Sequence, residues 1–321
     1  MNDIELRTKV TTVIDQFIAG WTTAQWENID GTIAQDVTLL SGQHGNITSI
    51  EALRESLALE SNLLSWVRKS NHATVIDQQV TQAISSQYLI GLFEKENRQF
   101  LFGASATFEF AINNQNEALL TKIKFQANWY KGDATLAQHW KYLPSDDGWT
   151  LGDPDPAIVS ELDAPWNLIQ SRQPQSDIKN AIAESYSKYS WAIDQNDISL
   201  LSDSYTPDAK GGFSPMGKLN GRHSIIGQQK NFRRHWPWMQ HFADVLRIDL
   251  DQDGQHANMI VGRIVPEALL TAHSDKVYGA HYQLRVRLDE DGEWRICWFD
   301  YRPGWFTSTT VPEVEIGITH A

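Results

Sequence analysis

The sequence predicts an α+β protein built from two tandem copies of one domain, each with helices followed by a sheet rich in antiparallel strands. Three observations lead to this fold class. The chain has 321 residues, which suits two domains of about 140 residues each better than a single core. Each half opens with apolar residues at helical spacing and continues in strand-like segments. The two halves also carry related residues in the same order.

Each half begins with a predicted amphipathic helix. Apolar residues recur there every three or four positions, which places them on one face of a helix. In the first half this stripe contains Leu6, Val10, Val13, Ile14, Phe17 and Trp21. In the second half it contains Ile178, Ile182, Tyr186, Tyr189 and Ile193. We therefore expect each helix to bury one face.

Alternating apolar and polar residues follow the helices and indicate strands joined as hairpins. In the second half, residues 245–250 alternate before an Asp- and Gly-containing turn, and residues 282–288 pair with residues 294–298 across another. In the first half, residues 106–110 and 119–129 flank an Asn-rich turn in the same way. Successive hairpins predict an antiparallel sheet.

An internal repeat relates the two halves. A shift of 172 residues places residues 35–37 on 207–209 and residues 49–53 on 221–225. Small changes in loop length bring the later segments into the same order. Because a repeat of this length encloses a complete set of predicted elements, it indicates a duplicated domain.

The repeat defines the predicted domains. We expect an N-terminal domain at 1–143, a linker at 144–175, a C-terminal domain at 176–308 and a tail at 309–321. The linker is rich in Pro, Asp, Gly and Ser, which is typical of a connector. Three apolar residues are expected to hold it on a domain surface: Trp149, Leu151 and Trp166.

The charge of the chain argues against nucleic acid as a partner. Lysine and arginine number 27 against 40 aspartates and glutamates, for a formal net charge of −13. Phosphate backbones require a concentrated positive surface. The chain also opens without an apolar signal segment and has no run of about 18 apolar residues, the length a membrane span needs. We therefore expect a cytoplasmic protein with no membrane contact.

Residue spacing predicts neither a disulfide nor a metal site. Cys297 is the single cysteine, and its neighbours suggest a strand position instead of a reactive thiol. The ten histidines show no spacing typical of zinc ligands. Residues 249–254 begin like a calcium loop, but Ile260 stands where a glutamate ligand is needed. We expect no metal and no cofactor.

Five short motifs in the second half resemble a known family when they are taken in order. They are Tyr189-Ser-Trp-Ala-Ile-Asp194, Tyr205-Thr-Pro-Asp208, Gly221-Arg222, Gln240-His241-Phe242 and Gly292-Glu-Trp294-Arg-Ile296. This order is similar to that of SnoaL-like proteins, in the nuclear-transport-factor-2-like superfamily with ketosteroid isomerase, scytalone dehydratase and hexachlorocyclohexane dehydrochlorinase. The resemblance covers residues 177–306 directly and residues 5–135 through the repeat.

The resemblance implies a shape and a mode of association for each domain. It implies a cone, in which a curved antiparallel-rich sheet wraps around the N-terminal helices and opens at one end into an apolar pocket. Domains of this kind often pair through their sheets. A tandem chain can form that pair within one molecule, and a homodimer is the other possibility.

The resemblance also implies a catalytic pair, Asp194 and His241. The chemistry is sound on general grounds, because a histidine can take a proton near neutral pH and a nearby carboxylate fixes its tautomer and stabilises the imidazolium. The alternatives are a solvated carboxylate at the end of a helix for Asp194 and a buried structural histidine for His241.

Further pocket residues are expected on the helix and on the strand at residues 278–284. They are Tyr189, Tyr278, His281, Tyr282 and Gln283. Neighbouring residues of a strand point to opposite faces, so His281 and Tyr282 need not share the pocket. Core packing is the alternative for Tyr189. Arg285 and Arg287 are candidates for binding a leaving anion, and surface exposure is the better interpretation.

The first half departs from this pattern. Thr22 stands at the position that matches Asp194, whereas His72 matches His241. Ser105 matches His281. Because a histidine without its carboxylate is a weaker base, we expect the N-terminal domain to be structural or to bind a ligand in a second pocket near His72 and Ser105.

Two functions from different classes remain. The first is a cofactor-independent lyase or isomerase, dehydratase-like, that acts by general acid–base catalysis on a small apolar or aromatic metabolite. The second is a non-catalytic protein that binds a small molecule or serves assembly. A fold alone hosts both, so the geometry of the site must decide.

Overall fold

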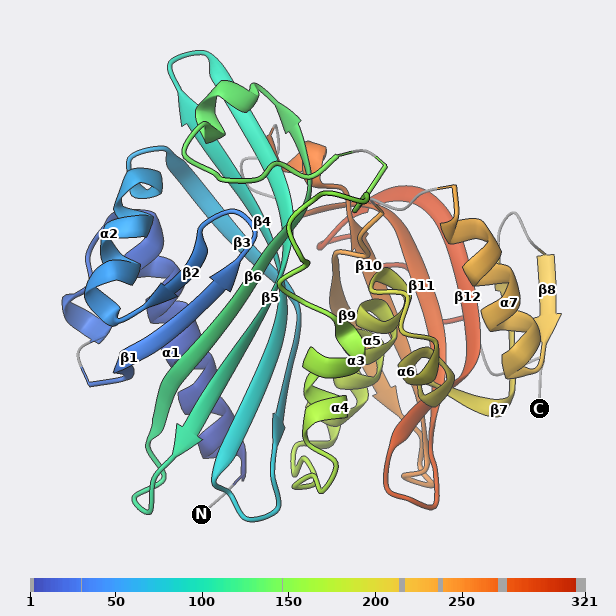
Figure 1. The fold of residues 1–321 in the computed structure, drawn as a ribbon. Coiled ribbons are helices and arrows are strands. Elements are labelled where there is room, and N and C mark those ends of the chain that lie inside the picture. Colours follow the sequence, from blue (N-terminus) through green and yellow to red (C-terminus); the bar gives the residue numbers. More distant parts are fainter. Residues whose placement is uncertain are drawn as a thin grey trace. The chain divides into compact units, whose positions relative to one another are not determined.

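The chain divides into two compact units, Met1–Ser176 and Asp177–Ala321 (Figure 1). The computed structural model describes residues 3–29, 31–145, 147–213, 217–235, 239–270 and 276–315. The segment predicted as a linker belongs to the first unit. Part of the predicted tail, residues 316–321, lies outside the described residues.

The first unit contains a six-stranded sheet with strand order β2-β1-β6-β5-β4-β3. Its elements are α1 (Asp3–Thr23), η1 (Glu27–Ile29), β1 (Ile33–Ser41), β2 (Gly45–Thr48), α2 (Ile50–Ser61), β3 (Leu64–Ile76), β4 (Gln82–Lys95), β5 (Arg98–Ile112), β6 (Ala118–Gly132), η2 (Ala134–Ala137), α3 (Ser160–Asp163) and α4 (Pro165–Leu168).

The second unit contains a six-stranded sheet with the equivalent order β8-β7-β12-β11-β10-β9. Its elements are α5 (Ile178–Asp194), α6 (Ile198–Asp203), β7 (Tyr205–Phe213), β8 (Gly217–Asn220), α7 (Arg222–Arg233), β9 (Ala243–Leu250), β10 (His256–Ile264), η3 (Pro266–Leu270), β11 (Val277–Leu288) and β12 (Trp294–Thr307).

The predicted α+β class is confirmed, and both units have the same topology. The bounds of β1, β2 and α2 recur 172 residues later in β7, β8 and α7. Within each sheet the strands pair antiparallel except at one place, where β1 lies parallel to β6 and β7 lies parallel to β12. The sheets are therefore antiparallel-rich, as the alternating segments predict.

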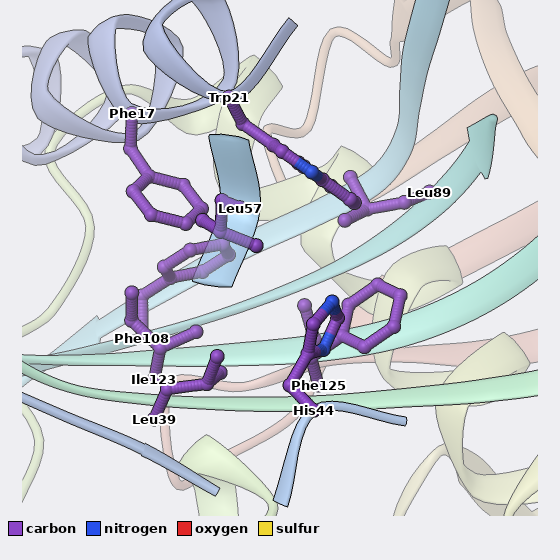
Figure 2. Close-up of a pocket in the computed structure, with 10 residues that line it drawn as sticks. Phe17, Trp21, Leu39, His44, Leu57, Leu89, Phe108, Ile123 and Phe125 are labelled. Atoms are coloured by element: carbon purple, nitrogen blue, oxygen red, sulfur yellow. The ribbon is translucent and has the colours of Figure 1, made fainter. Parts of the chain in front are cut away.

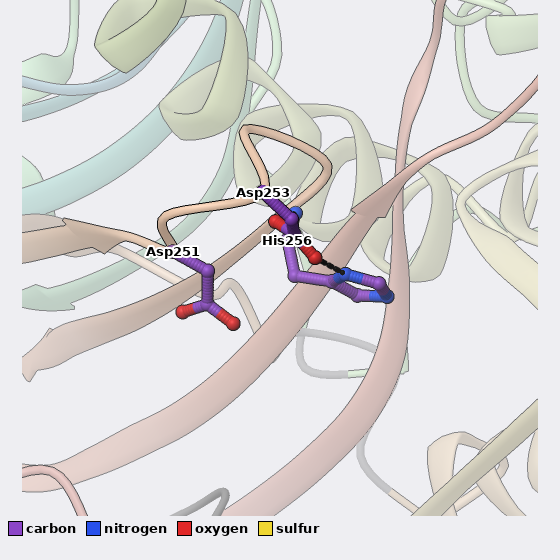
Figure 3. Close-up of side chains that lie close together, drawn as sticks. All are labelled: Asp251, Asp253 and His256. Carbon is purple, nitrogen blue, oxygen red and sulfur yellow. Dashed lines mark hydrogen bonds and ion pairs between the residues drawn. The ribbon is translucent and has the colours of Figure 1, made fainter.

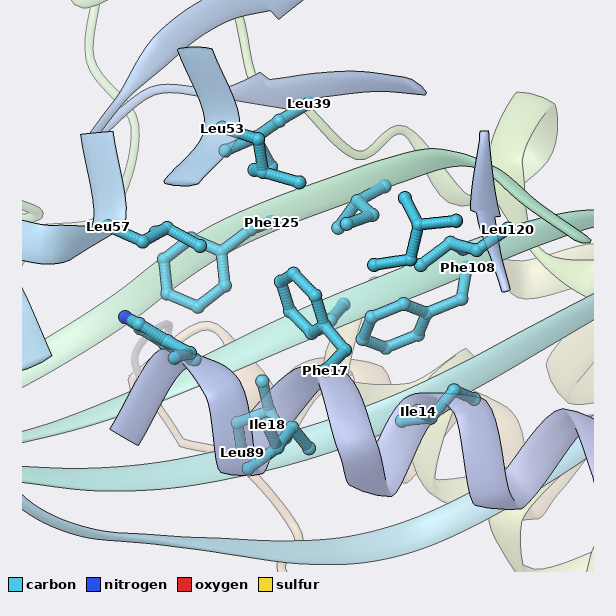
Figure 4. Packing of buried hydrophobic residues seen from close by; sticks show 14 of the residues in the cluster. Ile14, Phe17, Ile18, Leu39, Leu53, Leu57, Leu89, Phe108, Leu120 and Phe125 are labelled. Atoms are coloured by element: carbon cyan, nitrogen blue, oxygen red, sulfur yellow. The ribbon is translucent and has the colours of Figure 1, made fainter. Parts of the chain in front are cut away.

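The predicted apolar stripe of α1 is buried along its whole length against the sheet of the first unit (Figure 4). In the second unit, Ile182, Tyr186, Tyr189 and Ile193 of α5 are buried, whereas Ile178 at the start of the helix is exposed. Asp177 begins α5 by accepting hydrogen bonds from the backbone N–H groups of Lys179 and Asn180. The helix that carries Asp194 is thereby anchored at both its face and its start.

The connector is only partly held as predicted. Trp166 is buried, and Lys124 of β6 forms an ion pair with Asp163 of the connector. The expectation for Trp149 and Leu151 is wrong, because both are exposed, Leu151 to 96%. The indole N–H of Trp149 donates to the carbonyl of Pro154, so this part of the connector folds on itself.

Two further sequence observations can be compared with the structure. Cys297 lies in β12, and burial raises the pKa of its thiol to about 11, which suits a structural residue. Among the described residues, none of the helices combines the length and the apolar character needed to cross a membrane.

Candidate functional site

The Asp194 and His241 side chains meet at the end of α5. Asp194 is the last residue of the helix, and His241 stands two residues before β9, which packs against α5. Nδ1 of His241 lies 2.6 Å from Oδ1 of Asp194, and the backbone N–H of His241 donates to Oδ2 at 2.6 Å. Both carboxylate oxygens are therefore engaged by one residue.

This pair is largely removed from water. The side chain of Asp194 is 4% exposed and that of His241 is 11% exposed. Burial alone would raise the pKa of Asp194, but the His241 ring and the Arg233 guanidinium lower it below its usual range. Arg233 of α7 also donates to the backbone carbonyl of Asp194. The interpretation of Asp194 as a solvated carboxylate is therefore wrong, since His241 and Arg233 bind the end of α5.

The hydrogen bond to Asp194 sets the chemistry of the imidazole. An ionised carboxylate only accepts hydrogen bonds, so Nδ1 of His241 carries the proton. With the Nδ1 proton directed at the carboxylate, Nε2 is the nitrogen that can exchange a proton with a substrate, which is the arrangement of a carboxylate-oriented general base.

Aromatic side chains surround the His241 ring. Its centroid lies 6.3 Å from that of Tyr189 and 6.5 Å from that of Tyr282. Tyr186 contacts both tyrosines, and Phe299 packs against both as well. Tyr189 and Tyr282 were predicted as pocket residues, and the structure places both beside His241. Tyr186 and Phe299 are added by the structure.

A second polar group lies on the other side of Tyr189. Gln229 of α7 donates from Nε2 to the hydroxyl oxygen of Tyr205 at 2.9 Å and to that of Tyr189 at 3.3 Å. All three side chains are buried. These hydrogen bonds tie α7 and β7 to α5, and they fix the orientation of Tyr189 next to the imidazole.

Strand register explains which sheet residues reach this site. Tyr282 of β11 pairs with Val261 of β10 and with Tyr301 of β12, so the three side chains point to the face that carries α5. Arg263, two residues beyond Val261, shares that face and lies beside Tyr186, Tyr282 and Tyr301. Sequence reasoning missed Arg263, although alternation along β10 provides the signal.

The structure does not bring His281 and Gln283 to the imidazole. They flank Tyr282 in β11 and therefore point to the opposite face of the sheet. There, the Gln283 amide binds the backbone of Glu313 and Glu315 in the tail, and the His281 ring packs against Phe306. Gln283 therefore holds the tail on the sheet, whereas His281 packs against a residue of β12.

Tyr278 also lies away from the pair. A β-bulge between Tyr278 and Ala280 shifts the register, so Tyr278 shares the face of His281 instead of that of Tyr282. Its ring stacks on Phe306, and its hydroxyl donates to Asp244 at 2.8 Å. Alternation without the bulge would have placed it beside Tyr282, which is why the sequence misleads here.

The candidate anion-binding arginines of β11 are already paired. Arg285 forms an ion pair with Asp251, and Arg287 forms ion pairs with Asp208 and Asp289. Neither side chain reaches the Asp194–His241 pair. The expectation of surface exposure holds in part, because both side chains are partly buried at the sheet surface.

Comparison with protein families identifies this half of the chain. Residues 174–300 match the SnoaL-like domain family. They form a SnoaL-like domain. No curated protein matches the chain.

Several solved structures are similar to parts of the chain. One is a candidate aromatic ring hydroxylase from Novosphingobium aromaticivorans, with 15% identity, coverage of 43% of this chain and 100% of that chain, and a TM-score of 0.36. Another is hexachlorocyclohexane dehydrochlorinase LinA-type3 from Novosphingobium barchaimii, with 12% identity, coverage of 41% and 92%, and a TM-score of 0.37. A third, named as a scytalone dehydratase candidate from Novosphingobium aromaticivorans, shares 9% identity, covers 47% and 96%, and has a TM-score of 0.36.

The first unit lacks the pair found in the SnoaL-like domain. The hydroxyl of Thr22 donates to the carbonyl of Ile18 in its own helix. His72 lies in a bulge in the middle of β3, whereas His241 precedes β9. The two histidines therefore do not occupy equivalent places. His72 interacts with Gln87 and Thr74 through its ring nitrogens.

Ser105 and His72 lie on opposite faces of the sheet in the first unit. Ser105 accepts a hydrogen bond from Asn128 of β6 at 2.9 Å, whereas the adjacent residues Ala104 and Ala106 belong to the buried core. His72 faces α1, where it contacts Thr11. The structure therefore does not assemble the expected second pocket from His72 and Ser105.

A small apolar cavity with room for about one water molecule lies in the interior of the first unit (Figure 2). It is lined by Phe17, Trp21, Leu39, His44, Leu57, Leu89, Ala106, Phe108, Ile123 and Phe125. Aromatic rings fill the space around it, including Phe102 and Trp140. A substrate-sized molecule does not fit this cavity as it stands.

A buried carboxylate borders that cavity. Glu60 is fully buried, and its oxygens contact the ring nitrogens of Trp21 at 2.7 Å and of His44 and His139 at 3.0 Å each, and also that of Trp140. Burial alone would raise the pKa of Glu60, but His44, His139 and Trp140 lower it to about 2. This network joins α2 to three other segments of the unit.

One group of acidic residues and a histidine lies in the hairpin between β9 and β10 (Figure 3). It contains Asp251, Asp253 and His256, whose ligand atoms lie within 4.8 Å of one another. Asp251 already pairs with Arg285, and Asp253 pairs with His256. These contacts belong to the hairpin turn that the sequence predicts.

Proposed function

We propose that the SnoaL-like domain is a cofactor-independent lyase or isomerase in which His241 acts as the general base. The observation that carries this proposal is the buried contact of 2.6 Å between Nδ1 of His241 and Asp194. Imidazole is the side chain most often used for proton transfer at neutral pH, and this contact fixes its tautomer.

The proton transfer follows from the geometry. Nε2 of His241 takes a proton from an acidic carbon of the substrate, and the electron pair left behind either expels a leaving group or shifts within the molecule. The imidazolium that forms is stabilised by the ionised Asp194 carboxylate in a poorly hydrated site. The same imidazolium then returns its proton to the leaving oxygen or to a second carbon.

The surrounding side chains favour a small aromatic or largely apolar substrate. Tyr186, Tyr189, Tyr282 and Phe299 present ring surfaces around His241. Ring stacking and burial of apolar area would provide the binding energy. The non-catalytic alternative applies better to the first unit, whose interior is filled by aromatic side chains.

Proton exchange tests the proposed activity before the natural substrate is known. Small ketones and hydroxyketones fused to an aromatic ring are incubated with the protein in deuterium oxide, and loss of the acidic C–H signal is followed by NMR. We expect exchange above the buffer rate, and a loss of about 10²-fold or more in His241→Ala and Asp194→Asn.

His72→Ala and His256→Ala are the matched controls, since neither histidine belongs to the pair. Both are expected to keep the wild-type exchange rate. Equal losses in His72→Ala and His241→Ala would contradict the assigned roles. Binding of these ketones to the wild-type protein without any exchange would favour the non-catalytic alternative.

A further inference from the structure

Arg263 is an arginine on the helix-facing side of the second unit's sheet. It lies in β10, where it pairs with Ala280 of β11 and Ala243 of β9. Both strand partners are alanines, so they leave room for the guanidinium to lie beside Tyr282 and Tyr301. The side chain is partly buried, so the position of its charge has energetic consequences.

Arg263 differs from the other strand arginines of this unit in its charge environment. Each of the others forms an ion pair with at least one carboxylate: Arg247, Arg285, Arg287, Arg295 and Arg302. Within the described part of the chain, no carboxylate forms an ion pair with Arg263. A partly buried cation loses hydration that no carboxylate replaces here, so the site is suited to receive an anion.

The hydroxyl of Tyr186 supplies a second, independent observation. Tyr186 is 1% exposed, and its hydroxyl lies beside that of Tyr282. It makes no hydrogen bond of acceptable geometry with any described residue. A buried hydroxyl without a partner costs free energy comparable to a lost hydrogen bond. An arginine without a carboxylate partner and this hydroxyl therefore both lie next to Tyr282.

The tyrosines beside Arg263 are hydrogen-bond donors at neutral pH. Burial raises the pKa of Tyr282 to about 12, although Arg263 opposes that shift. Burial also raises the pKa of Tyr186 well above its usual value. Protonated phenols and a guanidinium offer donors without competing negative charge, which is the chemistry that an anionic oxygen requires.

We propose that Arg263, with Tyr186 and Tyr282, binds an anionic oxygen of the substrate while His241 acts on the same molecule. This inference rests on the proposed function of the site. It defines the substrate class as a small aromatic or apolar body that carries one carboxylate, phenolate or enolate oxygen. Tyr282 is a neighbour of both groups, since its ring packs beside His241 and Arg263 pairs with Ala280, two residues away on the same strand face.

Binding of simple anions and their neutral analogues tests the inference without turnover. Benzoate is compared with benzamide, and 4-nitrophenolate with 4-nitroanisole, by calorimetry on the full chain. We expect at least one anion to bind about 10-fold tighter than its neutral analogue, the gain of one charge-assisted contact. The benzoate and nitrophenolate arms show whether the oxygen is a carboxylate or a phenolate.

Arg263→Gln should abolish the preference for the anion, whereas Arg263→Lys should retain part of it. Arg285→Gln is the matched control, because Arg285 is already paired with Asp251 on a strand of the same sheet. It is expected to bind both anions as the wild type does. Retained preference in folded Arg263→Gln would overturn the inference.

The unmodified protein provides a test that does not depend on folding of a variant. If the wild type binds benzoate no better than benzamide and 4-nitrophenolate no better than 4-nitroanisole, the inference is wrong. His241→Ala separates this result from the proposed activity, because it should lose proton exchange and keep the preference for the anion. Exchange without that preference would leave the proposed function standing and remove only the anion site.

Discussion

The two units share one strand order but have different interiors. In the first, phenylalanine and tryptophan rings fill the space between α1 and the sheet, where Phe108 packs on Phe17 and Phe102 on Trp21. In the second, the equivalent space next to α5 contains tyrosine hydroxyls, an imidazole and a guanidinium, contributed by Tyr186, His241 and Arg263. The duplication therefore conserves the scaffold and changes the chemistry inside it.

The charged side chains inside the two units, Glu60 and Arg263, have opposite surroundings. The Glu60 carboxylate in the first unit contacts four ring nitrogens, so its charge is compensated by partners inside the protein. Arg263 in the second unit pairs with no carboxylate among the described residues. A satisfied network stabilises a fold, whereas an incomplete one suits a ligand. This difference supports the proposal that the first unit is structural and the second carries the chemistry.

Glu60→Gln is the largest expected perturbation of the first unit. The substitution leaves imidazole and indole N–H groups facing a neutral amide, and breaking a buried ionic network costs about 3–5 kcal/mol of the free energy of unfolding. Denaturant unfolding, with hydrogen exchange by mass spectrometry to locate the change, measures it. Exchange should increase in α2 and remain unchanged in the equivalent helix α7.

Glu55→Gln on the same helix is the control, since its side chain is exposed and no contact of the network involves it. It should leave the free energy of unfolding within about 0.5 kcal/mol of wild type. An equal loss in both variants would show that Glu60 is not a structural centre, and the contrast between the two units would weaken.

The pH dependence of the first unit gives a somewhat smaller effect. The folded-state pKa of Glu60 is about 2, below its ordinary value of 4.5, so the unfolded chain binds the proton first. The stabilisation is therefore complete above about pH 4.5 and is lost as the pH falls toward 2. We expect a loss of the order of 3 kcal/mol across this window. Glu60→Gln, measured at the same pH values, should lack that part of the dependence.

Local periodicity was sufficient to predict the opening helix and several strands of each unit. The stripe of α1 and the alternation in β9, β11 and β12 specify helices and strands because each side chain's face follows from its position in the chain. The 172-residue shift then transfers one topology to the other half. These predictions depend only on neighbours a few residues apart, which is why they are confirmed.

The candidate site could be predicted from the sequence only in part. Asp194 and His241 could be paired only through the family resemblance, since 47 positions separate them. The face of Tyr278 was mistaken because a bulge inserts a residue without changing the sequence pattern. The partners of Glu60 come from α1, the turn between β1 and β2, and the segment after η2. No short-range pattern predicts such a network.

Arg263 lies between these two cases. Ala257, Met259 and Val261 alternate along β10, so the sequence alone could have placed Arg263 on the same face. Whether a carboxylate reaches it depends on long-range packing, which periodicity does not report. The sequence pattern does not distinguish Arg263 from Arg285. Only the fold shows that Arg285 pairs with Asp251 and that Arg263 pairs with no carboxylate among the described residues.

The smallest predicted effect tests the contrast within the second unit itself. Tyr186→Phe removes a buried hydroxyl that has no partner among the described residues, so it should raise the free energy of unfolding by up to about 1 kcal/mol. Tyr205→Phe removes an acceptor that Gln229 uses, so it should lower the free energy by about 1 kcal/mol. Denaturant unfolding monitored by hydrogen exchange in α5 measures both.

Opposite signs for two identical chemical changes would show that the interior holds an unfilled site next to Tyr186, and Tyr186→Phe should also weaken the binding of anions. Destabilisation by both substitutions would mean that the Tyr186 hydroxyl already has a partner, and the second unit would then resemble the first.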